Sequence, residues 1–482
     1  MCIGAGASRR RPVADPLRRP VAWAHPARCQ RRARFWLRPA VLGAGAQLLQ
    51  RRTRPEREKP AQPSRPRHGP VAPTPGSAMT HDSPAQPLFL GESGFSSETP
   101  RPALPHLPPL SLYIHIPWCV RKCPYCDFNS HTASPVLPEQ EYVDALLADL
   151  DLDLPHVYGR ELQSIFFGGG TPSLFSANAL GRLLRGVEQR IRFASDIEIT
   201  LEANPGTFEQ AKFSAYRGLG INRLSIGIQS FQASKLKALG RIHNGDEAIR
   251  AADMARQAGF DNFNLDLMHG LPDQSQDEAL DDLRQAIALA PTHLSWYQLT
   301  LEPNTVFWNQ PPVLPEDDIL WDIQETGQQL LATQGYAQYE VSAYAQPGKP
   351  ARHNLNYWAF GDFIGIGAGA HGKLSHPDGR IIRTWKTRLP KDYLNPDKPF
   401  QAGSKLLPLD ELPFEFLMNA LRLTNGVDAA LFRERTGLSL DSLTGARRQA
   451  EQKGLLHEDQ ARLIATPQGQ LFLNDLLQYF LI

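Results

Sequence analysis

Short apolar runs alternate with helix-like stretches through the middle of the chain, between about residues 110 and 300. Six of these runs read as strands, at 112–116, 164–167, 196–202, 223–229, 262–268 and 293–301. The stretch after the second run repeats leucines at helical spacing from Leu180 to Val187, and Ser176 is suited to cap that helix. Alternating strands and helices indicate a parallel sheet with right-handed crossovers.

Six strand–helix units are two short of a closed eight-stranded barrel, so the predicted fold is α/β, an open six-stranded (β/α)6 partial TIM barrel. In such barrels the chemistry gathers where the strands end. Five of the six runs are followed there by residues unusual for a plain turn: Cys119, 168–171, Glu202 with Asn204, Gln229 and Gly270.

The pattern changes after about residue 310. We expect strands at 336–344 and 381–385, on either side of a glycine-rich segment at 361–372. From about residue 405 helical patterns dominate, followed by a hairpin-like stretch at 454–465 and a last amphipathic helix. Helices with a small hairpin indicate an α+β, winged-helix-like unit for packing or docking. The predicted division is a barrel at 111–310, a barrel extension at 311–400 and a C-terminal domain at 401–482.

Charge is unevenly distributed along the chain. Residues 1–78 hold 17 of the 51 basic residues but only three of the 50 acidic ones, which leaves 34 basic and 47 acidic residues, or −13, for 79–482. An acidic body lacks the basic footprint of a nucleic-acid-binding protein. No apolar run reaches the roughly 18 residues that a membrane span requires.

Residues 1–78 are rich in Arg and Pro and show no sustained period, so we expect them to be disordered. They fit either an organelle transit peptide or upstream sequence ahead of a true start at Met79; the proline content favours the second. Residues 79–110 read as a Pro-rich linker. The Arg9-Arg10 pair is not followed by a convincing apolar segment, so we do not expect export.

Three of the five cysteines lie in one loop directly after the first predicted strand, and the other two lie in the leader. Clustered rather than paired cysteines favour a cytoplasmic protein that uses thiolates as ligands. The spacing Cys119, Cys123, Cys126 suits three irons of a 4Fe–4S cluster, with the fourth iron open to an exchangeable ligand. The alternative is zinc, but a structural zinc site usually takes four ligands and two separated cysteine pairs.

This spacing after the first strand of a partial barrel resembles the radical S-adenosylmethionine (SAM) superfamily. The stretch 113–131, YIHIPWCVRKCPYCDFNSH, is similar to the oxygen-independent coproporphyrinogen III oxidase family, and specifically to its HemW branch of heme chaperones. The similarity runs from about residue 110 to the C-terminus. It implies a 4Fe–4S cluster held by three cysteines and SAM, with one-electron cleavage of the SAM sulfonium.

The resemblance also implies a set of SAM-binding and substrate-pocket residues. Strand-end glycines let a backbone approach a ligand closely, and a carboxylate suits a ribose diol. Each residue taken alone could be an ordinary buried polar group or a turn. Together they match the family pattern: Tyr113, Tyr125, Gly169, Gly170, Thr171, Glu202, Gln229, Arg241 and Asp266.

Two features separate the branches of the family. The oxidase branch carries a further cysteine two residues after the third cluster cysteine, where this chain has Phe128. The segment Arg352–Trp358 holds the H-N-x-x-Y-W motif that the HemW branch links to heme, with His353 as a candidate iron ligand and Tyr357 and Trp358 as aromatic neighbours. The alternative is a structural loop in which His353 only makes hydrogen bonds. His371 is a second candidate ligand.

Three functions therefore compete. The favoured one is a heme chaperone that binds heme, transfers it to an acceptor protein and binds SAM, with SAM cleavage left open. The second is a radical SAM coproporphyrinogen III oxidase, a decarboxylase, and the third, a nucleic-acid-modifying enzyme, is disfavoured by the acidic body. The resemblance further implies an electron donor such as a flavodoxin or ferredoxin, and peripheral contact with membrane hemoproteins.

The first prediction concerns the leader. We expect a chain that begins at Met79 to keep its iron–sulfur cluster and its yield in the supernatant, because residues 1–78 have the composition of a segment without a packed core. Iron content and yield of the shortened and full-length chains test this. A shortened chain that loses either property would show that the leader belongs to the working protein.

Overall fold

The structure is a computed structural model that describes residues 100–206 and 210–481. The leader predicted at 1–78, and the part of the predicted linker before residue 100, lie outside the described residues.

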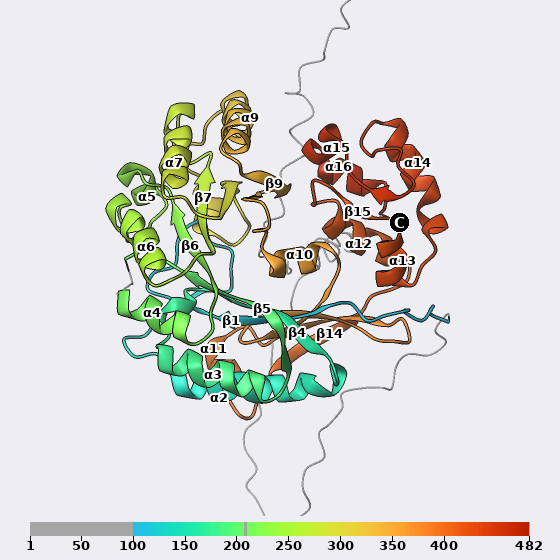
Figure 1. Ribbon diagram of the computed structural model, residues 1–482, viewed down its shortest axis with the longest axis horizontal. Coiled ribbons are helices and arrows are strands. Elements are labelled where there is room, and N and C mark those ends of the chain that lie inside the picture. Colours follow the sequence, from blue (N-terminus) through green and yellow to red (C-terminus); the bar gives the residue numbers. More distant parts are fainter. Residues whose placement is uncertain (1–99, 207–209, 482) are drawn as a thin grey trace, which may run out of the picture.

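The six predicted strands form, and they lie side by side in chain order with parallel pairing. They are β1 (Leu110–Ile116), β4 (Glu161–Gly169), β5 (Arg192–Ala203), β6 (Arg223–Gln229), β7 (Phe263–His269) and β8 (His293–Gln298). Figure 1 shows the sheet curving with helices along its outer side. The predicted partial barrel is confirmed. Two short strands, β2 (Trp118–Cys119) and β3 (His131–Thr132), pair in the loop after β1.

Helices cover the outer face of the barrel. They are α2 (Glu139–Asp153), α3 (Ala177–Glu188), α4 (Gln210–Gly218), α5 (Ala233–Ala238), α6 (Gly245–Gln257), α7 (Gln276–Ala288) and α9 (Asp317–Thr333), with 3-10 turns η3 (Leu154–His156) and η4 (Pro172–Leu174) between them. Helix α8 (Val306–Asn309) lies instead against the segment after β1, where Phe307 N donates to Pro124 O at 3.0 Å. Ser176 caps α3 as predicted, accepting from Ala179 N at 3.2 Å. In the described part of the chain, no helix is both long and apolar enough to cross a bilayer.

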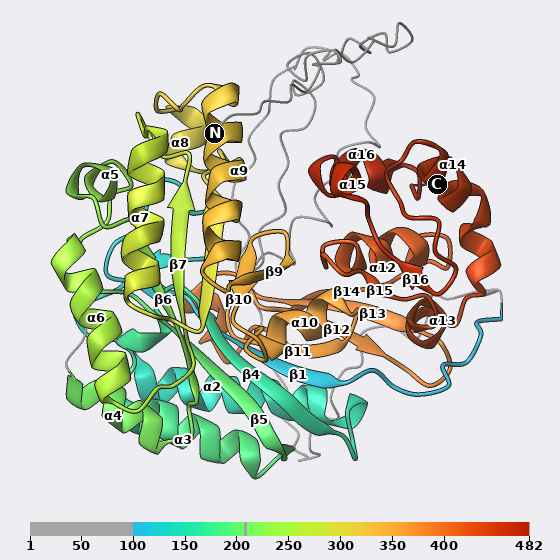
Figure 2. The same cartoon turned by 45° about the horizontal axis from the view of Figure 1, so that its top comes forward.

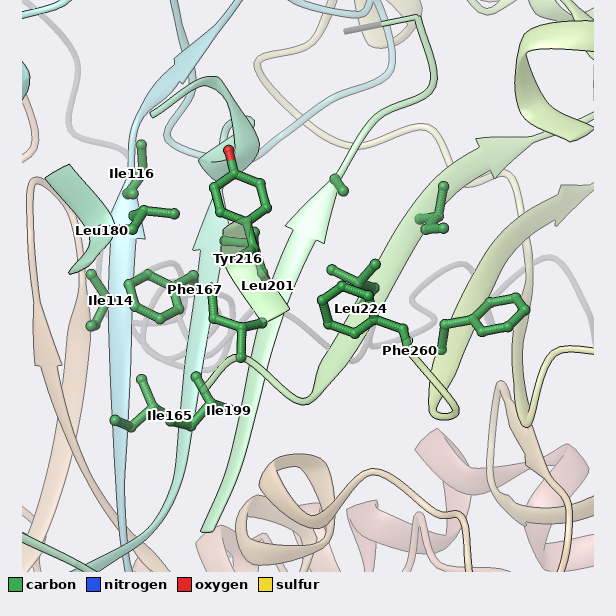
Figure 3. Close-up of a cluster of buried hydrophobic side chains, with 14 of the residues drawn as sticks. Ile114, Ile116, Ile165, Phe167, Leu180, Ile199, Leu201, Tyr216, Leu224 and Phe260 are labelled. Carbon is green, nitrogen blue, oxygen red and sulfur yellow. The ribbon is translucent and has the colours of Figure 1, made fainter. Parts of the chain in front are cut away.

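The core of the barrel lies between the strands and these helices. Alternate residues of each strand, such as Ile114, Ile165 and Leu201, are fully buried on the helical side (Figure 3). The other face of the same strands points into the lumen. Because side chains alternate along a strand, one sequence pattern sets both the core and the lumen lining.

The sheet continues beyond the barrel on both sides. The strand predicted at 336–344 is a hairpin of β9 (Ala337–Glu340) and β10 (Ala343–Ala345), antiparallel to β8. Next to β1 lie β11 (Asp362–Ile366), β12 (His371–Ser375), β13 (Ile381–Lys386) and β14 (Gln401–Leu406), with β11 parallel to β1 and the rest antiparallel. The strand predicted at 381–385 forms as β13, whereas no strand was predicted within the glycine-rich segment 361–372, where β11 and the start of β12 lie. Gly365 permits this pairing, because a Cβ there would lie 1.9 Å from the His371 carbonyl oxygen.

The C-terminal residues form a second hydrophobic core. Its elements are α12 (Leu412–Ala420), β15 (Val427–Asp428), α13 (Ala430–Thr436), η5 (Leu440–Leu443), α14 (Thr444–Gln452), β16 (Arg462–Leu463), α15 (Pro467–Leu471) and α16 (Leu473–Gln478); α11 (Pro390–Tyr393) precedes them. The hairpin expected at 454–465 forms, with Leu456 bridged to Ala465. Strand order and helices fit the winged-helix-like prediction.

Helix α10 (Arg352–Trp358) lies between the barrel and the C-terminal helices (Figures 1 and 2). The Arg422 guanidinium lies over the Trp358 ring at 4.4 Å and pairs with Glu340 at 3.0 Å. Both partners of that ion pair are buried, so α10 is clamped where the two parts of the molecule meet.

Buried ion pairs fasten β11 to its neighbours. The fully buried Asp362 carboxylate pairs with Lys373 at 2.9 Å and with Arg160 at 2.9 Å, and accepts from Ser375 Oγ at 2.8 Å. Burial lowers the pKa of Lys373 to about 8, and the Asp362 charge opposes that shift. A cation this deeply buried depends on its counterion.

We therefore expect Asp362→Ala to destabilise the fold by about 3–5 kcal/mol, because it leaves Lys373 buried without its acid. The measurement is the free energy of unfolding in urea. The matched control is Asp378→Ala, which breaks an exposed pair with Arg380 and should cost less than about 1 kcal/mol. Equal losses in the two variants would contradict this role for Asp362.

Candidate functional site

The three cysteines lie between β1 and β3, in residues 117–130, which we call the cysteine loop. Hydrogen bonds hold this loop at several points. Cys119 belongs to β2, which pairs with β3, and the Cys119 carbonyl accepts from Ala133 N at 2.8 Å. Cys126 N donates to Cys123 O at 3.2 Å. Lys122 Nζ reaches across the loop to the carbonyls of Phe128 and Ser130, each at 3.2 Å. The backbone therefore holds three half-buried thiols on one short segment.

Electrostatics at these thiols depends on burial and on one cation. Burial raises the pKa of Cys119 to about 11 and also raises the pKa of Cys126, so without metal both are neutral thiols. Arg241 Nη1 lies 3.7 Å from Cys123 Sγ and donates to it. Loading with metal must release the thiol protons, and Arg241 offsets the negative charge that develops.

The loop fits a cluster better than a single ion. The described residues contain no group of three His, Cys, Asp or Glu side chains that could hold one metal ion. A 4Fe–4S cluster instead takes each thiolate on a different iron. Three free thiols in one loop, with a guanidinium beside one of them, therefore fit the cluster that the spacing predicts.

The segment 168–171 at the end of β4, which we call the glycine segment, packs directly against the cysteine loop. Gly170 N donates to Ile116 O at 2.8 Å, and Thr171 N donates to Trp118 O at 2.7 Å. A Cβ at Gly170 would lie 2.5 Å from the Trp118 carbonyl oxygen, so only glycine allows this approach. Gly169 has φ +112° and its N–H donates to Glu202 Oε2 at 3.2 Å. The predicted Gly169, Gly170 and Thr171 thus lie beside the predicted cluster.

A small pocket opens between the cysteine loop and the turn after α5. It is lined by Val120, Arg121, Cys123, Thr171, Asn204, Gly240, Arg241, Ile242 and His243. Asn204 links two predicted residues, donating to Thr171 Oγ1 at 2.8 Å and accepting from Arg241 Nη2 at 2.6 Å. From sequence, Asn204 was recognised only as a strand-end residue and was not assigned to the site. Its position two residues after Glu202, on a strand that ends at the same edge, was the available signal.

Two carboxyl groups lie deeper in the barrel. Burial, with the Asp266 charge second, raises the pKa of Glu202 to about 8. Asp266 accepts from Ser225 Oγ at 3.0 Å and from Asn264 Nδ2 at 2.8 Å, yet burial still raises its pKa. Glu202 is therefore largely protonated near neutral pH in this state and is able to donate or accept a hydrogen bond toward a ligand hydroxyl.

Gln229 is held in a strained backbone conformation. Its φ of 71° is in the left-handed region, which is uncommon for a residue with a side chain. Tyr297 OH donates to its Oε1 at 2.9 Å. Tyr125 is buried near Phe307, with ring centroids 6.4 Å apart. Both predicted residues thus lie at the end of the barrel that carries the cysteine loop.

The residues predicted for heme lie elsewhere. His353, Tyr357 and Trp358 are buried on α10, against the beginnings of the strands. His353 Nδ1 is 2.8 Å from Ser164 Oγ on β4, and its Nε2 is 2.9 Å from Tyr357 OH. His371, half-buried at the start of β12, has its pKa lowered to about 4 by burial. The structure does not bring His353 to the cysteine loop, and both of its ring nitrogens are engaged.

This chain is similar to known proteins over most of its length. Residues 113–286 match the radical SAM superfamily, and residues 407–472 match the HemN C-terminal domain. Heme chaperone HemW of Escherichia coli (strain K12) is 56% identical over 380 residues, covering 78% of this chain and 99% of that protein. Heme chaperone HemW of Bacillus subtilis (strain 168) is 33% identical over 381 residues, covering 77% and 99%. The solved structure of coproporphyrinogen III oxidase (HemN) from Escherichia coli, a radical SAM enzyme, superposes with a TM-score of 0.67 at 23% identity, covering 78% of this chain and 90% of that one.

We expect Cys119→Ala, Cys123→Ala and Cys126→Ala each to abolish the cluster, because the body of the chain has no other cysteine to take the vacant position. After anaerobic reconstitution each variant should lack about four irons and the brown charge-transfer absorbance. Cys29→Ala, in the leader, is the matched control and should load normally. A loop variant with a full 4Fe–4S spectrum would show that the ligand set is different.

Proposed function

The chain belongs to the HemW family of heme chaperones, within the radical SAM superfamily, and on this basis we propose that it binds heme and delivers it to an acceptor protein. One combined observation carries the proposal. The chain is 56% identical to heme chaperone HemW of Escherichia coli over 99% of that protein, and it has Phe128 in the cysteine loop. The resemblance places a further cysteine at that position in the oxidase branch.

Phe128 is built into the loop through its backbone. Its carbonyl oxygen accepts from Ser130 N at 2.7 Å and from Lys122 Nζ at 3.2 Å, and its side chain is half-buried. A phenylalanine here supplies neither a thiol nor an acid for chemistry on a porphyrin side chain. This residue favours the chaperone over the oxidase alternative, for which the likeness to the solved oxidase supports the fold alone.

We assign cluster binding to Cys119, Cys123 and Cys126, with Arg241 beside Cys123 to balance thiolate charge. When bound, the reduced cluster supplies one electron to the sulfonium of SAM. The chain's own part is to bind and orient SAM and to exclude water. We assign this to the residues around the glycine segment and the lumen: Tyr113, Tyr125, Gly169, Gly170, Thr171, Glu202, Gln229 and Asp266.

Partners of two kinds belong to the proposal, a heme acceptor and a one-electron donor such as a flavodoxin or ferredoxin. Exposed Arg121 and Lys122 lie in the cysteine loop, and exposed Arg388 lies next to it, since Asn129 Nδ2 donates to Arg388 O at 2.8 Å. A local cationic patch on an otherwise acidic body suits an acidic donor protein. The three free thiols of the loop support a cytoplasmic location.

The prediction that His353 ligates heme iron stays a prediction. Because both ring nitrogens make hydrogen bonds in this state, ligation would require one of those bonds to break. Burial and the nearby Arg223 charge lower the pKa of His353 to about 3, so its ring is neutral, as an iron ligand must be.

Heme binding and oxidase activity are tested side by side. We expect the wild-type protein, with cluster and SAM, to bind about one heme per chain in a spectroscopic titration and to release no carbon dioxide from coproporphyrinogen III. The variant Phe128→Cys tests whether a thiol at this position is enough to give the chain oxidase activity. Phe128→Leu, which changes the side chain without adding a thiol, is its matched control. If the wild type binds no heme but decarboxylates coproporphyrinogen under reducing conditions, the chaperone function is wrong.

A further inference from the structure

Three aromatic rings form a column through the barrel lumen, from α10 toward the cysteine loop. The rings of His353 and Phe166 are stacked, with centroids 5.1 Å apart and planes at 28°. Phe166 stacks in turn on Tyr113, at 6.3 Å and 20°. Tyr113 and Phe166 face each other in the β1–β4 register, so the sheet itself keeps their rings side by side. We call His353, Phe166 and Tyr113 the ring column.

The upper end of the ring column reaches both parts of the proposed SAM site. Tyr113 OH is 3.0 Å from His115 Nδ1, and His115 Nε2 is 2.9 Å from Asn129 O. A carbonyl oxygen only accepts, so Nε2 carries the proton and Nδ1 accepts from Tyr113. Asn129 belongs to the cysteine loop. Gly169 lies against the His115 ring, since a Cβ there would be 2.5 Å from His115 Cε1. Tyr113 is therefore connected to both segments through the His115 ring.

The lower end of the ring column is fixed in place. His353 is 1% exposed, and its two ring nitrogens are held by Ser164 Oγ and Tyr357 OH. Its backbone is held too, since the N–H groups of Arg352 and His353 both donate to the buried Glu198 carboxylate at 3.1 Å. Because the ring is held at both nitrogens and its backbone is held too, it has one orientation. A ring with one orientation is suited to support the stacked Phe166 ring.

A second route joins α10 to the proposed site on the opposite wall. Ala351 N donates to Tyr339 OH at 3.4 Å, and Tyr339 OH donates to His293 Nε2 at 2.9 Å. His293 Nδ1 donates to Asn264 Oδ1 at 2.7 Å, and Asn264 Nδ2 donates to Asp266 Oδ1 at 2.8 Å. Asp266 is one of the residues assigned to SAM. The start of α10 is therefore bonded to both walls of the lumen.

We propose that His353 is a positioning residue for SAM binding: through Phe166 and Tyr113 it holds the cysteine loop and the glycine segment in place, and this role replaces the heme-iron ligation that the sequence predicts for it. The inference rests on the SAM site of the proposed function. Helix α10, which carries the H-N-x-x-Y-W motif, is then the floor of the SAM-binding barrel.

The experiment measures SAM and heme separately on the full chain with its cluster reconstituted. SAM affinity is obtained by equilibrium dialysis with labelled SAM, and heme affinity and the Soret band by titration. We expect His353→Ala to weaken SAM binding about tenfold, roughly the effect of losing one aromatic contact, and to leave the Soret band in place. His353→Phe keeps the stacking ring and should bring SAM affinity back to within about threefold of wild type.

The matched control is His376→Ala, which removes a half-buried imidazole whose ring contacts His156 outside the lumen, at 5.8 Å. It should leave SAM affinity unchanged. Wild-type SAM affinity in His353→Ala, failure of His353→Phe to recover it, or a shifted Soret band in His353→Ala would each overturn the proposal. If His353→Ala does not fold, Phe166→Leu interrupts the ring column instead and should weaken SAM binding similarly. Absence of heme binding in the wild type would refute the chaperone function without affecting the SAM comparison.

Discussion

Polar atoms buried in the lumen of this barrel must find hydrogen-bond partners, and much of the structure follows from that constraint. Barrels of this type usually fill their interior with branched apolar side chains. Here the lumen face carries Glu198, Glu202, Asp266 and His293, all buried or nearly so. An unpaired polar group in such a place costs about 1–3 kcal/mol. The lumen therefore needs polar groups from elsewhere to complete it.

At the end of the barrel where the strands begin, α10 supplies those groups. At the end that carries the cysteine loop, SAM supplies them under the proposed function. At the floor, two backbone N–H groups of α10 satisfy Glu198, and His353 satisfies Ser164. Nearer the cysteine loop, the Glu202 carboxyl group accepts from Gly169 N at 3.2 Å, yet burial still raises its pKa to about 8. A ligand that carries hydroxyl groups would supply a further partner to Glu202.

Much of the site could be predicted from sequence because parallel strands all end at one edge. The strand-end residues Cys119, 168–171, Glu202, Asn204, Gln229 and Gly270 were expected at one edge for that reason, and the parallel pairing of the strands places their ends at the same edge. Strand β11 was missed because Gly365 interrupts its short apolar run and further glycines flank it, although Gly365 is what permits the close pairing. The placement of α10 could not be predicted, because the residue pattern of 352–358 does not indicate which end of the barrel this helix closes. One ring nitrogen of His353 contacts Ser164, 189 positions away, and its ring stacks on Phe166 of the same strand, whereas the other nitrogen contacts Tyr357 within α10.

The link between the floor of the barrel and its mouth is most directly measured by hydrogen exchange. The amide N–H groups of Arg352 and His353, bonded to Glu198, report on the floor, and those of 168–171 report on the mouth. With the cluster loaded, we expect added SAM to slow exchange in both segments, because completing the lumen network restricts opening of α10 as well. Slower exchange in 168–171 alone, with 352–358 unchanged, would contradict the coupling between α10 and the SAM site.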